Sequence, residues 1–575
     1  MVLVMAVLDM VGVASIMPFM AVLANPEVVE THRYLQAVYQ RLGFSDTPSF
    51  LFFLGVVVFV ALVVATAGRA LTTYATVRFT QMRNYSLSRK LVAGYLGQPY
   101  EFFLNRHSAD LGKSVLAEVE QVIGGALMPA INLVSHGAVA LALLGLLIVL
   151  DPVLALTVTV VLGGAYGLIY LVLRRYLHRL GQDLLQANRS RFTEVQEAFG
   201  GIKDIKVLGL EGEFLQRFEG PANRYARTMA ARAVVQQMPR FALEIVTFGG
   251  LLLVILYLLA GAGGLQQALP VIAVYAFAGY RLMPALQNIY SQAAALRFAG
   301  PMLDALHRDL VALDPAGRAA LSRHRVAPLG LSTGLSLREI GYTYPGADRP
   351  VLAGLTLTVP ARATVGLVGA TGSGKTTLVD LILGLLPPEQ GELWVDGQRL
   401  TAENRRAWQR TIGYVPQHIY LADASVAANI AFGVPEGRID AAAVERAARI
   451  ANLHEFVVGQ LPRGYATTIG ERGVRLSGGQ RQRIGIARAL YHDPELLILD
   501  EATSALDNLT EQAVMEAVRC LGHRKTIILI AHRLTTVREC DQIFLLENGR
   551  LEGQGTFEEL TRQNTRFRAM AGAMG

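Results

Sequence analysis

Cysteine is scarce in this sequence, since only Cys520 and Cys540 occur among 575 residues. Such a pair excludes a disulfide framework and favours a reducing cytosol, so both residues are interpreted as small buried side chains. Charged residues are also few, at 17% against 52% hydrophobic residues. Soluble domains usually carry about a quarter charged residues. The deficit argues against an ordinary soluble protein and indicates a membrane.

The long apolar runs all lie before residue 290, and the second half of the chain reads as soluble. About 20 apolar residues cross a bilayer. The first run lacks the basic start of a cleaved signal peptide, so we expect a retained span there. The six predicted spans are residues 2–24, 50–73, 129–150, 152–173, 241–261 and 267–288.

The distribution of Lys and Arg predicts the orientation of the spans. Residues 74–128 contain six of these residues and residues 174–240 contain twelve, whereas the first connection contains only Arg33 and Arg41. Loops rich in Lys and Arg stay cytoplasmic. The two long stretches are therefore predicted to be cytoplasmic, and they account for the formal net charge of +7 without nucleic acid.

Helical apolar spacing over residues 87–96 and 184–199 predicts that the spans continue as helices into the cytosol. These helices are interrupted at Gln98-Pro99-Tyr100 and at Gly200-Gly201. The outer connection, 26–44, fits either a short amphipathic helix on the membrane face or an ordinary solvated loop.

Three regions follow from this reading. Residues 1–313 form an all-α transmembrane domain with six helices and cytoplasmic extensions, 314–333 form a linker, and 334–575 form an α/β domain. In the last region strand and helix signals alternate, which is typical of a largely parallel sheet.

The sequence Gly369-Ala-Thr-Gly372-Ser373-Gly374-Lys375-Thr376 follows an apolar strand and opens a helix at Thr377. This is the context of a P-loop, whose glycines let backbone N–H groups surround phosphate oxygens. Lys375 supplies a cation for the outer phosphates, and the Thr376 hydroxyl can ligate Mg²⁺. The sequence therefore predicts ATP as the ligand.

Two further motifs belong to the same domain. The strand Leu496–Leu499 ends in Asp500, which suits the Mg²⁺ shell, and Glu501, which can polarise an attacking water. Ser477-Gly478-Gly479-Gln480 opens a helix, which gives a second anion site from N–H groups and the helix dipole.

In these motifs the chain resembles the ATP-binding cassette (ABC) transporters, whose signature sequence faces the P-loop of a second copy. The resemblance implies that Tyr344 stacks on adenine and that Gln417 contacts the nucleotide and its Mg²⁺. It also implies that Ser477, Gly478, Gly479 and Gln480 contact ATP in the partner cassette.

The family's remaining motifs occur in order. Thr468–Gly473 is similar to the exporter motif ahead of the signature, Ser504–Asp507 matches the D-loop, and His532 matches the switch histidine at the γ-phosphate. Six spans ahead of one cassette resemble the exporter arrangement, and the two breaks resemble coupling helices. The resemblance implies a homodimer in a bacterial-type inner membrane, with a cytoplasmic cassette that hydrolyses ATP and no nucleic-acid partner. Exporters of this type usually have a basic amphipathic helix before the first span, whereas here the apolar run begins directly after Met1. Either the true start of the protein lies upstream or this copy lacks that helix.

Three arginines adjoin the apolar runs: Arg69 and Arg281 inside the second and sixth spans, and Arg240 at the start of the fifth. A charge among apolar residues is costly and usually faces a cavity or a partner. They either pair locally, as Arg240 can with Glu244, or line a cationic cavity for a phosphate or pyrophosphate head group.

The segments Met238–Glu244, Tyr280–Pro284 and Ser15–Phe19, together with the outer connection read as a helix, are similar to the bacterial lipid-linked oligosaccharide flippases of protein glycosylation. That resemblance implies a membrane-lipid substrate with an anionic head group. An exporter of drugs, peptides or other lipids would share every cassette motif but would not need all three arginines. A non-transporting ABC ATPase, such as a nucleic-acid machine, would lack the six spans.

Overall fold

The computed structural model describes residues 2–24, 26–44, 46–104, 106, 108–150, 152–153, 156, 159–260, 264–313, 326–470, 473–502, 508–521, 524–531 and 533–572. The chain divides into two compact units. One contains Met1–Gln98 and Asn105–Leu321, and the other contains Ser322–Gly575 together with the short segment Pro99–Leu104. The first unit is helical and the second carries both β-sheets.

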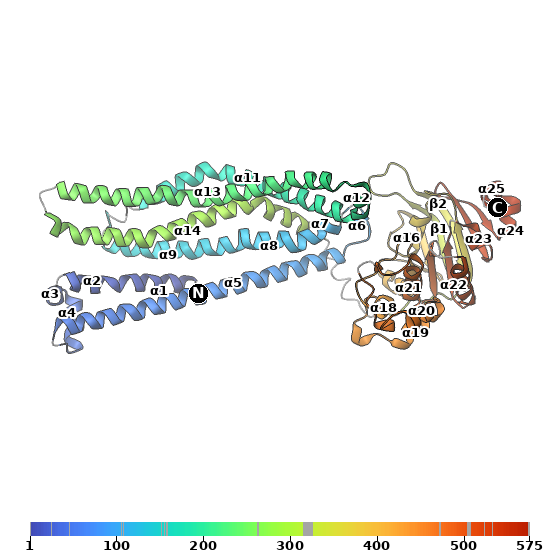
Figure 1. Ribbon diagram of the computed structural model, residues 1–575, viewed down its shortest axis with the longest axis horizontal. Helices are drawn as coiled ribbons and strands as arrows, with labels where there is room; N and C mark the ends of the chain where they lie inside the picture. Colours follow the sequence, from blue (N-terminus) through green and yellow to red (C-terminus); the bar gives the residue numbers. More distant parts are fainter. Residues whose placement is uncertain are drawn as a thin grey trace. The chain divides into compact units, whose positions relative to one another are not determined.

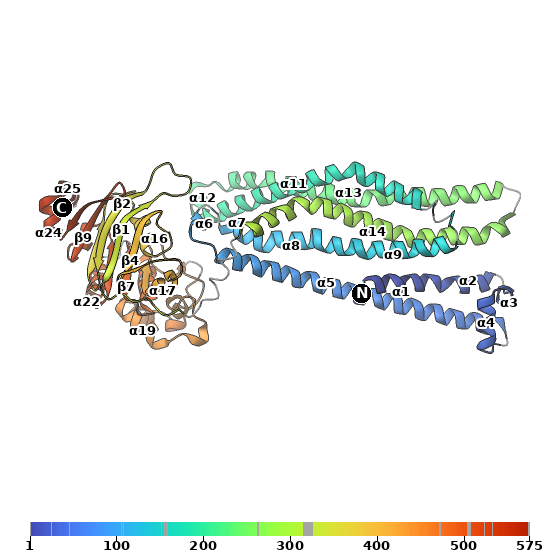
Figure 2. The same ribbon diagram turned by 180° about the vertical axis from the view of Figure 1, so that it is seen from behind.

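The helical unit consists of long helices that lie side by side along most of their length (Figures 1 and 2). Its elements are α1 Val2–Ala14, α2 Ile16–Ala24, α3 Val28–Thr31, α4 Arg33–Arg41, α5 Thr47–Leu96, α7 Ser108–Lys113, α8 Val119–Val122, α9 Met128–Leu150, α11 Gly164–Gly200, α12 Ile202–Leu208, α13 Glu211–Ala260 and α14 Gly264–Ala312. Three π-helical turns, Ser114–Glu118, Ile123–Leu127 and Thr159–Gly163, adjoin α8, α9 and α11.

Each predicted span coincides with helical backbone among the described residues. By length and composition, the helices Thr47–Leu96, Leu111–Leu146 and Thr159–Gly200 could each cross a membrane. The first predicted span is divided at Ser15 into α1 and α2, and the fifth and sixth lie within α13 and α14. Residue 151, between the third and fourth predicted spans, and residues 261–263, where the fifth and sixth are connected, lie outside the described residues.

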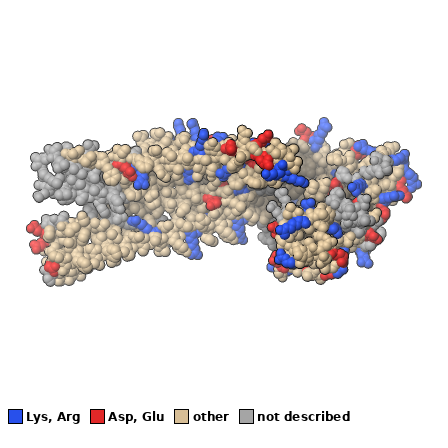
Figure 3. All heavy atoms as spheres, viewed as in Figure 1, with Lys and Arg blue, Asp and Glu red and all other residues tan. Residues whose placement is uncertain are grey.

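Close packing holds α11 against α14. Leu177 on α11 and Ala294 on α14 are fully buried in one cluster with Tyr166 and Tyr290. At Gly181, a Cβ atom would lie 2.1 Å from the Phe298 carbonyl oxygen, so any side chain there would force the two helices apart. On the face shown in Figure 3, basic side chains of this unit are concentrated away from the end formed by α3 and α4. That asymmetry agrees with the predicted orientation.

The polar connections are helical too. The outer connection contains α4, which confirms its interpretation as a helix over that as a plain loop. The predicted breaks at Gln98–Tyr100 and Gly200-Gly201 separate the long helices from short ones, α6 (Glu101–Leu104) and α12. In α12, Ile202, Val207 and Leu208 are 43%, 76% and 66% exposed, so this short helix exposes three apolar side chains.

The second unit is built on two sheets. The strands are β1 Gly334–Tyr342, β2 Leu352–Pro360, β3 Thr364–Val368, β4 Gln390–Val395, β5 Gln398–Arg399, β6 Ile412–Val415, β7 Leu496–Asp500, β8 Thr526–Ile530, β9 Gln542–Glu547 and β10 Arg550–Gly555. A four-stranded antiparallel sheet has the order β2-β1-β4-β5, and a six-stranded sheet has the order β10-β9-β3-β8-β7-β6. All pairs in the second sheet are parallel except β10 with β9. Both faces of a parallel sheet are normally covered, which explains why β7 and β8 are buried along their whole length.

The helices of this unit are α16 Lys375–Ile382, α17 Arg405–Gln409, α18 Val426–Ile430, α19 Ala441–Ile450, α20 His454–Gln460, α21 Gly478–Leu490, α22 Asn508–Leu521, α23 Leu534–Val537, α24 Phe557–Gln563 and α25 Thr565–Gly572. Ordered contacts of the unit begin before β1, within the predicted linker, because Asp396 accepts hydrogen bonds from the backbone N–H groups of Ser332 and Thr333.

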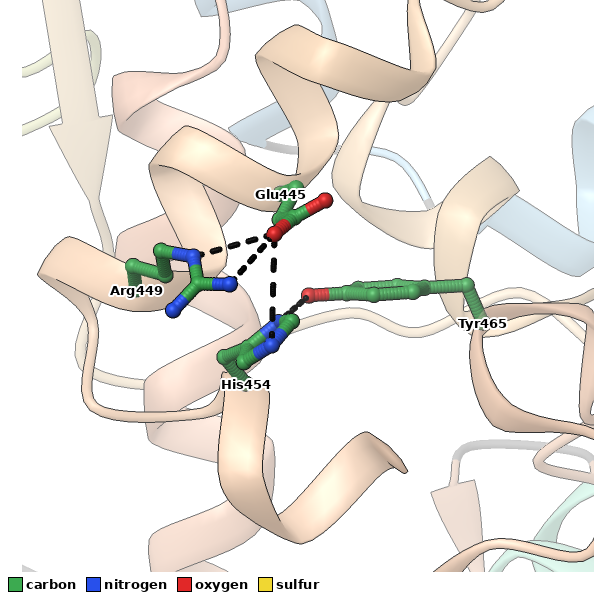
Figure 4. A network of polar contacts seen from close by, with 4 residues as sticks. All are labelled: Glu445, Arg449, His454 and Tyr465. Atoms are coloured by element: carbon green, nitrogen blue, oxygen red, sulfur yellow. Dashed lines mark hydrogen bonds and ion pairs between the residues drawn. The ribbon is translucent and has the colours of Figure 1, made fainter. Parts of the chain in front are cut away.

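A polar network joins the helices next to the signature helix α21 (Figure 4). The Glu445 Oε1 atom accepts hydrogen bonds from Arg449 Nε and Nη2 at 3.0 and 2.5 Å and lies 4.0 Å from His454 Nε2. His454 Nδ1 is in turn 3.0 Å from the Tyr465 hydroxyl. Polar contacts at the surface therefore connect α19 with α20, and α20 with the turn at Tyr465.

Candidate functional site

The P-loop lies between β3 and α16, as the sequence predicts. Gly372 and Gly374 have φ values of 80° and 98°, a left-handed conformation that favours glycine. A Cβ atom at Gly369 would lie 2.3 Å from the Leu546 carbonyl oxygen, whereas one at Gly372 would meet no atom of the described residues within 4 Å. The loop is thus held against β9 on one side and open at Gly372, where backbone can approach a phosphate closely.

Lys375 begins α16 and is 7% exposed. Its Nζ atom donates hydrogen bonds to the carbonyl oxygens of Gly369 and Ala370 at 2.7 and 3.0 Å. Burial lowers the pKa of Lys375, while the carboxylates of Glu501 and Asp500 act in the opposite direction. An ammonium has three donors, so Lys375 can still serve an anion. Among the described residues, the buried Ser373 Oγ atom has no hydrogen-bond partner, which suits a ligand at this loop.

The structure brings Gln417 to the end of β7. The Gln417 Nε2 atom donates to Glu501 Oε2 at 2.9 Å, although the residues are 84 positions apart. Glu501 has a left-handed φ of 48°, and Asp500 just before it is 8% exposed. Strained backbone of this kind is concentrated at functional sites. The predicted base is therefore held by a hydrogen bond beside the predicted Mg²⁺ ligand.

The Mg²⁺ prediction rests on the donors at this place. Thr376, Gln417 and Asp500 supply a hydroxyl, an amide carbonyl and a carboxylate, all oxygen donors of the kind that Mg²⁺ prefers. Because Gln417 contacts Glu501 through nitrogen, its amide oxygen remains the atom for a cation. Among the described residues no group of three His, Cys, Asp or Glu could hold a metal, so any ion here would depend on the phosphates and water as well.

Two residues near the site were missed by the sequence reasoning. The Tyr414 hydroxyl on β6 donates to Asp500 Oδ2 at 3.4 Å. Asp380 lies on α16, and its pKa is raised to about 6 by burial and by the nearby Asp500 carboxylate. A single acid in the apolar run Thr377–Ile382 was the signal that could have identified Asp380.

Replacing Asp380 with Asn is expected to stabilise the protein more at pH 8 than at pH 5. The folded protein holds the Asp380 proton to a higher pH than the unfolded chain, so its free energy of unfolding falls as pH rises from about 4 through 6. Asn does not ionise, so the variant does not lose this part of the free energy of unfolding as the pH rises. Thermal unfolding in detergent without nucleotide should show a gain in Tm of about 2 °C or more at pH 8. Asp348→Asn, in an exposed loop, is the control. Equal shifts at both pH values would contradict the expectation.

At the predicted adenine end, Tyr344 is half-buried. Its hydroxyl is 3.1 Å from Thr377 Oγ1 on α16, and its ring meets the Tyr342 ring edge-on with centroids 5.2 Å apart at 89°. Tyr344 is thereby held next to the helix that the P-loop opens. Its predicted role in stacking on adenine stays a prediction.

The predicted signature residues form the start of α21. Ser477 is the N-cap; its Oγ accepts from the Gln480 N–H at 3.2 Å, and the Ser477 N–H donates to Gln480 Oε1 at 2.9 Å. This capping box leaves the N–H groups of Gly478 and Gly479 at the helix start. Residues 471–472 of the exporter motif, the D-loop residues Ser504–Asp507 and the switch histidine His532 lie outside the described residues.

The three candidate substrate arginines differ in their surroundings. Arg240 Nε donates to Glu244 Oε1 at 2.8 Å, with the two side chains 59% and 36% exposed, so the local pair anticipated from the sequence is formed. Arg69 lies on an exposed position of α5. Arg281 lies on α14, and its side chain is outside the described part of the chain. Of the two cysteines, Cys540 is buried as predicted, and the Cys520 side chain is not described.

Comparison with known proteins agrees with this architecture. Residues 12–279 match the family described as "ABC transporter transmembrane region", and residues 352–504 match "ABC transporter". The chain is 34% identical over 472 residues to an "ATP-dependent lipid A-core flippase" of Cupriavidus pinatubonensis, which covers 82% of this chain and 78% of the relative. It is 34% identical over 377 residues to the "Heterocyst differentiation ATP-binding protein HepA" of a Nostoc species, covering 65% of this chain and 60% of that one.

A solved structure titled "Structure of a bacterial Atm1-family ABC exporter with ATP bound" superposes with a TM-score of 0.80. It covers 100% of this chain and 97% of the other at 22% identity, so it bears on the fold alone. The membrane helices, the cassette and the sequence relatives lead to one assignment. The chain belongs to the ABC exporters, as a half-transporter of the bacterial inner membrane whose cytoplasmic cassette binds ATP and couples its hydrolysis to transport.

Proposed function

We propose that this exporter flips an amphipathic lipid with an anionic head group, specifically a lipid-linked oligosaccharide carried on pyrophosphate. The observation that carries the proposal is the placement of Arg69 and Arg281 within apolar helical segments, with Arg240 near the start of another. Guanidinium stays protonated in proteins, so it cannot avoid the cost of an apolar setting by losing its charge. A diphosphate would bind these arginines through charge-assisted and often bidentate hydrogen bonds.

The relatives' names support the coarser form of this proposal, since several are called lipid A-core flippases. A lipid-linked oligosaccharide and a lipid A-core molecule share the relevant chemistry, namely a glycan, phosphate groups and an acyl or prenyl tail. The pair between Arg240 and Glu244 does not oppose the proposal, because both side chains are more than a third exposed and an exposed pair contributes little stability. A phosphate can therefore compete for that arginine.

In the cassette we assign each residue a role in ATP hydrolysis. Lys375 and the N–H groups of the glycine loop bind the phosphates, and Tyr344 stacks on adenine. Glu501, oriented by its hydrogen bond with Gln417, accepts the proton of the attacking water. Thr376, Gln417 and Asp500 would hold Mg²⁺, which neutralises charge on the phosphates. His532 completes the set at the γ-phosphate.

The working unit is proposed to be a homodimer with Mg²⁺-ATP at its interface. One chain offers one P-loop and one signature, and each ATP would lie between the P-loop of one copy and Ser477–Gln480 of the other. The exposed apolar side chains of α12 fit the same assembly, because they need a partner surface. We propose that α12 and the segment Tyr100–Phe103 transmit cassette motion to the spans.

Substitution of the three arginines tests the substrate class. Arg69→Ala, Arg240→Ala and Arg281→Ala together are expected to lower flipping of a fluorescent lipid-linked glycan in proteoliposomes by at least about tenfold, because each loses a charge-assisted hydrogen bond. Basal ATPase activity should change much less. Lys at these positions should restore transport only in part, since Lys lacks the guanidinium fork.

Arg89→Ala is the matched control, since Arg89 is exposed on α5 but beyond the predicted span. A lipid A-core probe, assayed in parallel, separates the two glycolipids. Preferential flipping of that probe would replace the oligosaccharide assignment while keeping the anionic head group. Unchanged transport by a well-folded triple variant would refute the head-group proposal and favour an exporter of apolar substrates.

A further inference from the structure

The segment Pro99–Leu104 joins α5 to α7 in the sequence, but it clusters with the cassette unit rather than with the helices that it connects. It contains the single turn α6, whose residues Glu101, Phe102 and Phe103 are half-buried. Phe102 and Phe103 meet edge-on with centroids 5.3 Å apart. Because this short connection packs into the cassette, a movement of the cassette can displace it only through the side chains that contact it.

One such contact is a hydrogen bond to the end of strand β1. The Tyr342 hydroxyl donates to Glu101 Oε1 at 2.9 Å across 241 positions of sequence. Tyr342 is only 2% exposed. Burial raises the pKa of its phenol, as does the bond to Glu101, so the group keeps its proton and stays a donor at physiological pH. A charge-assisted bond of this kind is about twice as strong as a neutral one.

The other side of Tyr342 faces the nucleotide-binding residues. Its ring lies edge-on against Tyr344 at 5.2 Å, an arrangement that is favourable and directional. The Tyr344 hydroxyl is 3.1 Å from Thr377 Oγ1, and Thr377 is 4% exposed in the first turn of the P-loop helix. The residues Thr377, Tyr344, Tyr342 and Glu101 therefore form a continuous row of contacts, which we call the tyrosine row.

Tyr100 gives independent evidence that the connecting segment lies close to this region. Burial raises the pKa of Tyr100, and electrostatic interactions with Asp380 and Tyr344 raise it further. Asp380 belongs to α16, the same helix as Thr377. Tyr100 and Glu101 thus interact with different residues of this region, Tyr100 with Asp380 and Tyr344 and Glu101 with Tyr342.

We propose that Tyr342 is a positioning residue that makes α6 follow the adenine-binding tyrosine when ATP binds. Stacking of adenine on Tyr344 would fix its ring, the edge-on contact would fix Tyr342, and the hydrogen bond would hold Glu101 and hence α6 in register with the cassette. The inference rests on the proposed role of this segment in transmitting motion. Beyond that role, the inference identifies Tyr342 as the cassette side chain that holds the segment. It also ties the position of the segment to the binding of adenine rather than of the phosphates.

The simpler explanation is that Glu101 only satisfies a buried hydroxyl, which costs free energy when left without a partner. The two explanations differ in what Tyr342→Phe changes. A purely structural bond would lower stability and affect all activities alike. A positioning bond would leave ATP hydrolysis intact and separate it from movement of the spans.

The test measures both movements in one protein, without needing the transported substrate. Spin labels are placed on the purified full-length protein at Gln40→Cys on the exposed face of α4, and separately at Glu436→Cys on the exposed cassette surface, with Cys520 and Cys540 replaced by Ala. Pulsed dipolar spectroscopy then gives the distance between the two copies with and without Mg²⁺-ATP. A Glu501→Gln background holds the ATP-bound state.

Tyr342→Phe is expected to keep the ATP-induced shift at position 436 and to lose at least about half of the shift at position 40. With Glu501 restored, the KM for ATP should be unchanged and kcat within about twofold of the parent. Glu101→Gln keeps an oxygen acceptor and should behave as the parent, whereas Glu101→Ala should resemble Tyr342→Phe. The double variant Glu101→Ala with Tyr342→Phe should be no worse than either single variant.

Tyr491→Phe is the matched control, because it also removes one hydroxyl that bonds within the cassette, here with the Asp440 N–H at 3.0 Å. It should leave both shifts intact. A full shift at position 40 in Tyr342→Phe would overturn the proposal, and so would loss of both shifts together. If Glu101→Gln lost as much of the shift at position 40 as Glu101→Ala, the hydrogen bond would not be the cause. Absence of any dipolar signal in the parent would refute the homodimer and the tyrosine row's role with it.

Discussion

Glu501→Gln is expected to reduce kcat for ATP hydrolysis by about 10²–10⁴-fold, the contribution that a positioned general base usually makes. ATP binding should persist, because Gln keeps the size of the side chain and leaves Lys375, Asp500 and the glycine loop unchanged. The structure holds the Glu501 carboxylate 2.9 Å from Gln417 Nε2, where it is oriented before a substrate arrives. Phosphate release and binding of a fluorescent ATP analogue measure the two quantities separately.

The control for this substitution is Glu445→Gln, the same chemical change in the same cassette. Glu445 belongs to the network around α19 and α20 (Figure 4), apart from the P-loop motifs in sequence, and should leave kcat near its parent value. Lys375→Ala should instead weaken both ATP binding and turnover, since its ammonium is proposed to contact phosphate. If Glu501→Gln hydrolysed ATP at the parent rate, the base would have to be another residue.

The motifs could be located from the sequence because each is a local backbone feature. The apolar strand predicted directly ahead of the P-loop is β3, and the strand predicted at 496–499 coincides with all but the last residue of β7. Glycines at 369, 372 and 374 predict a loop that other residues would strain, and the structure shows it. The pair between Arg240 and Glu244 was foreseeable for the same reason, since residues four apart share one face of a helix.

Contacts between distant parts of the chain could not be predicted in this way. The bonds of Gln417 with Glu501 and of Tyr342 with Glu101 span 84 and 241 positions, and no periodicity in the sequence links them. The raised pKa of Asp380 likewise comes from burial next to Asp500, which depends on how α16 packs on the sheet. The sequence indicates which residues carry chemistry, whereas the packing of distant elements decides which of them meet.

Mixing two inactive copies is expected to restore ATP hydrolysis. In a Lys375→Ala dimer both P-loops are defective, and in a Gly479→Asp dimer both signatures repel phosphate. A mixed dimer contains one composite site whose P-loop and signature are both intact. Once it is isolated from the two inactive parent dimers, the mixed dimer has one good site of two, so roughly half of the activity of the unmodified protein should return. An acid in the first turn of α21 is compatible with the helix, because negative charge is favourable at its N-terminus.

The readout is phosphate release after the two purified variants, each silent alone, are exchanged in detergent, with the mixed species isolated through two different affinity tags. Lys375→Ala mixed with a second Lys375→Ala copy is the control for exchange itself. A double variant that carries both changes in one chain is also mixed with the parent protein. The isolated mixed dimer should have no intact composite site, because each of its sites contains either the defective P-loop or the defective signature. Under an arrangement in which each chain completes its own site, that last mixture would keep the parent copy's activity and the two single variants would stay inactive together. The two mixtures thus give opposite results for the two arrangements. Activity in the dimer of double variant and parent, with none in the dimer of the two single variants, would refute sharing of ATP between copies.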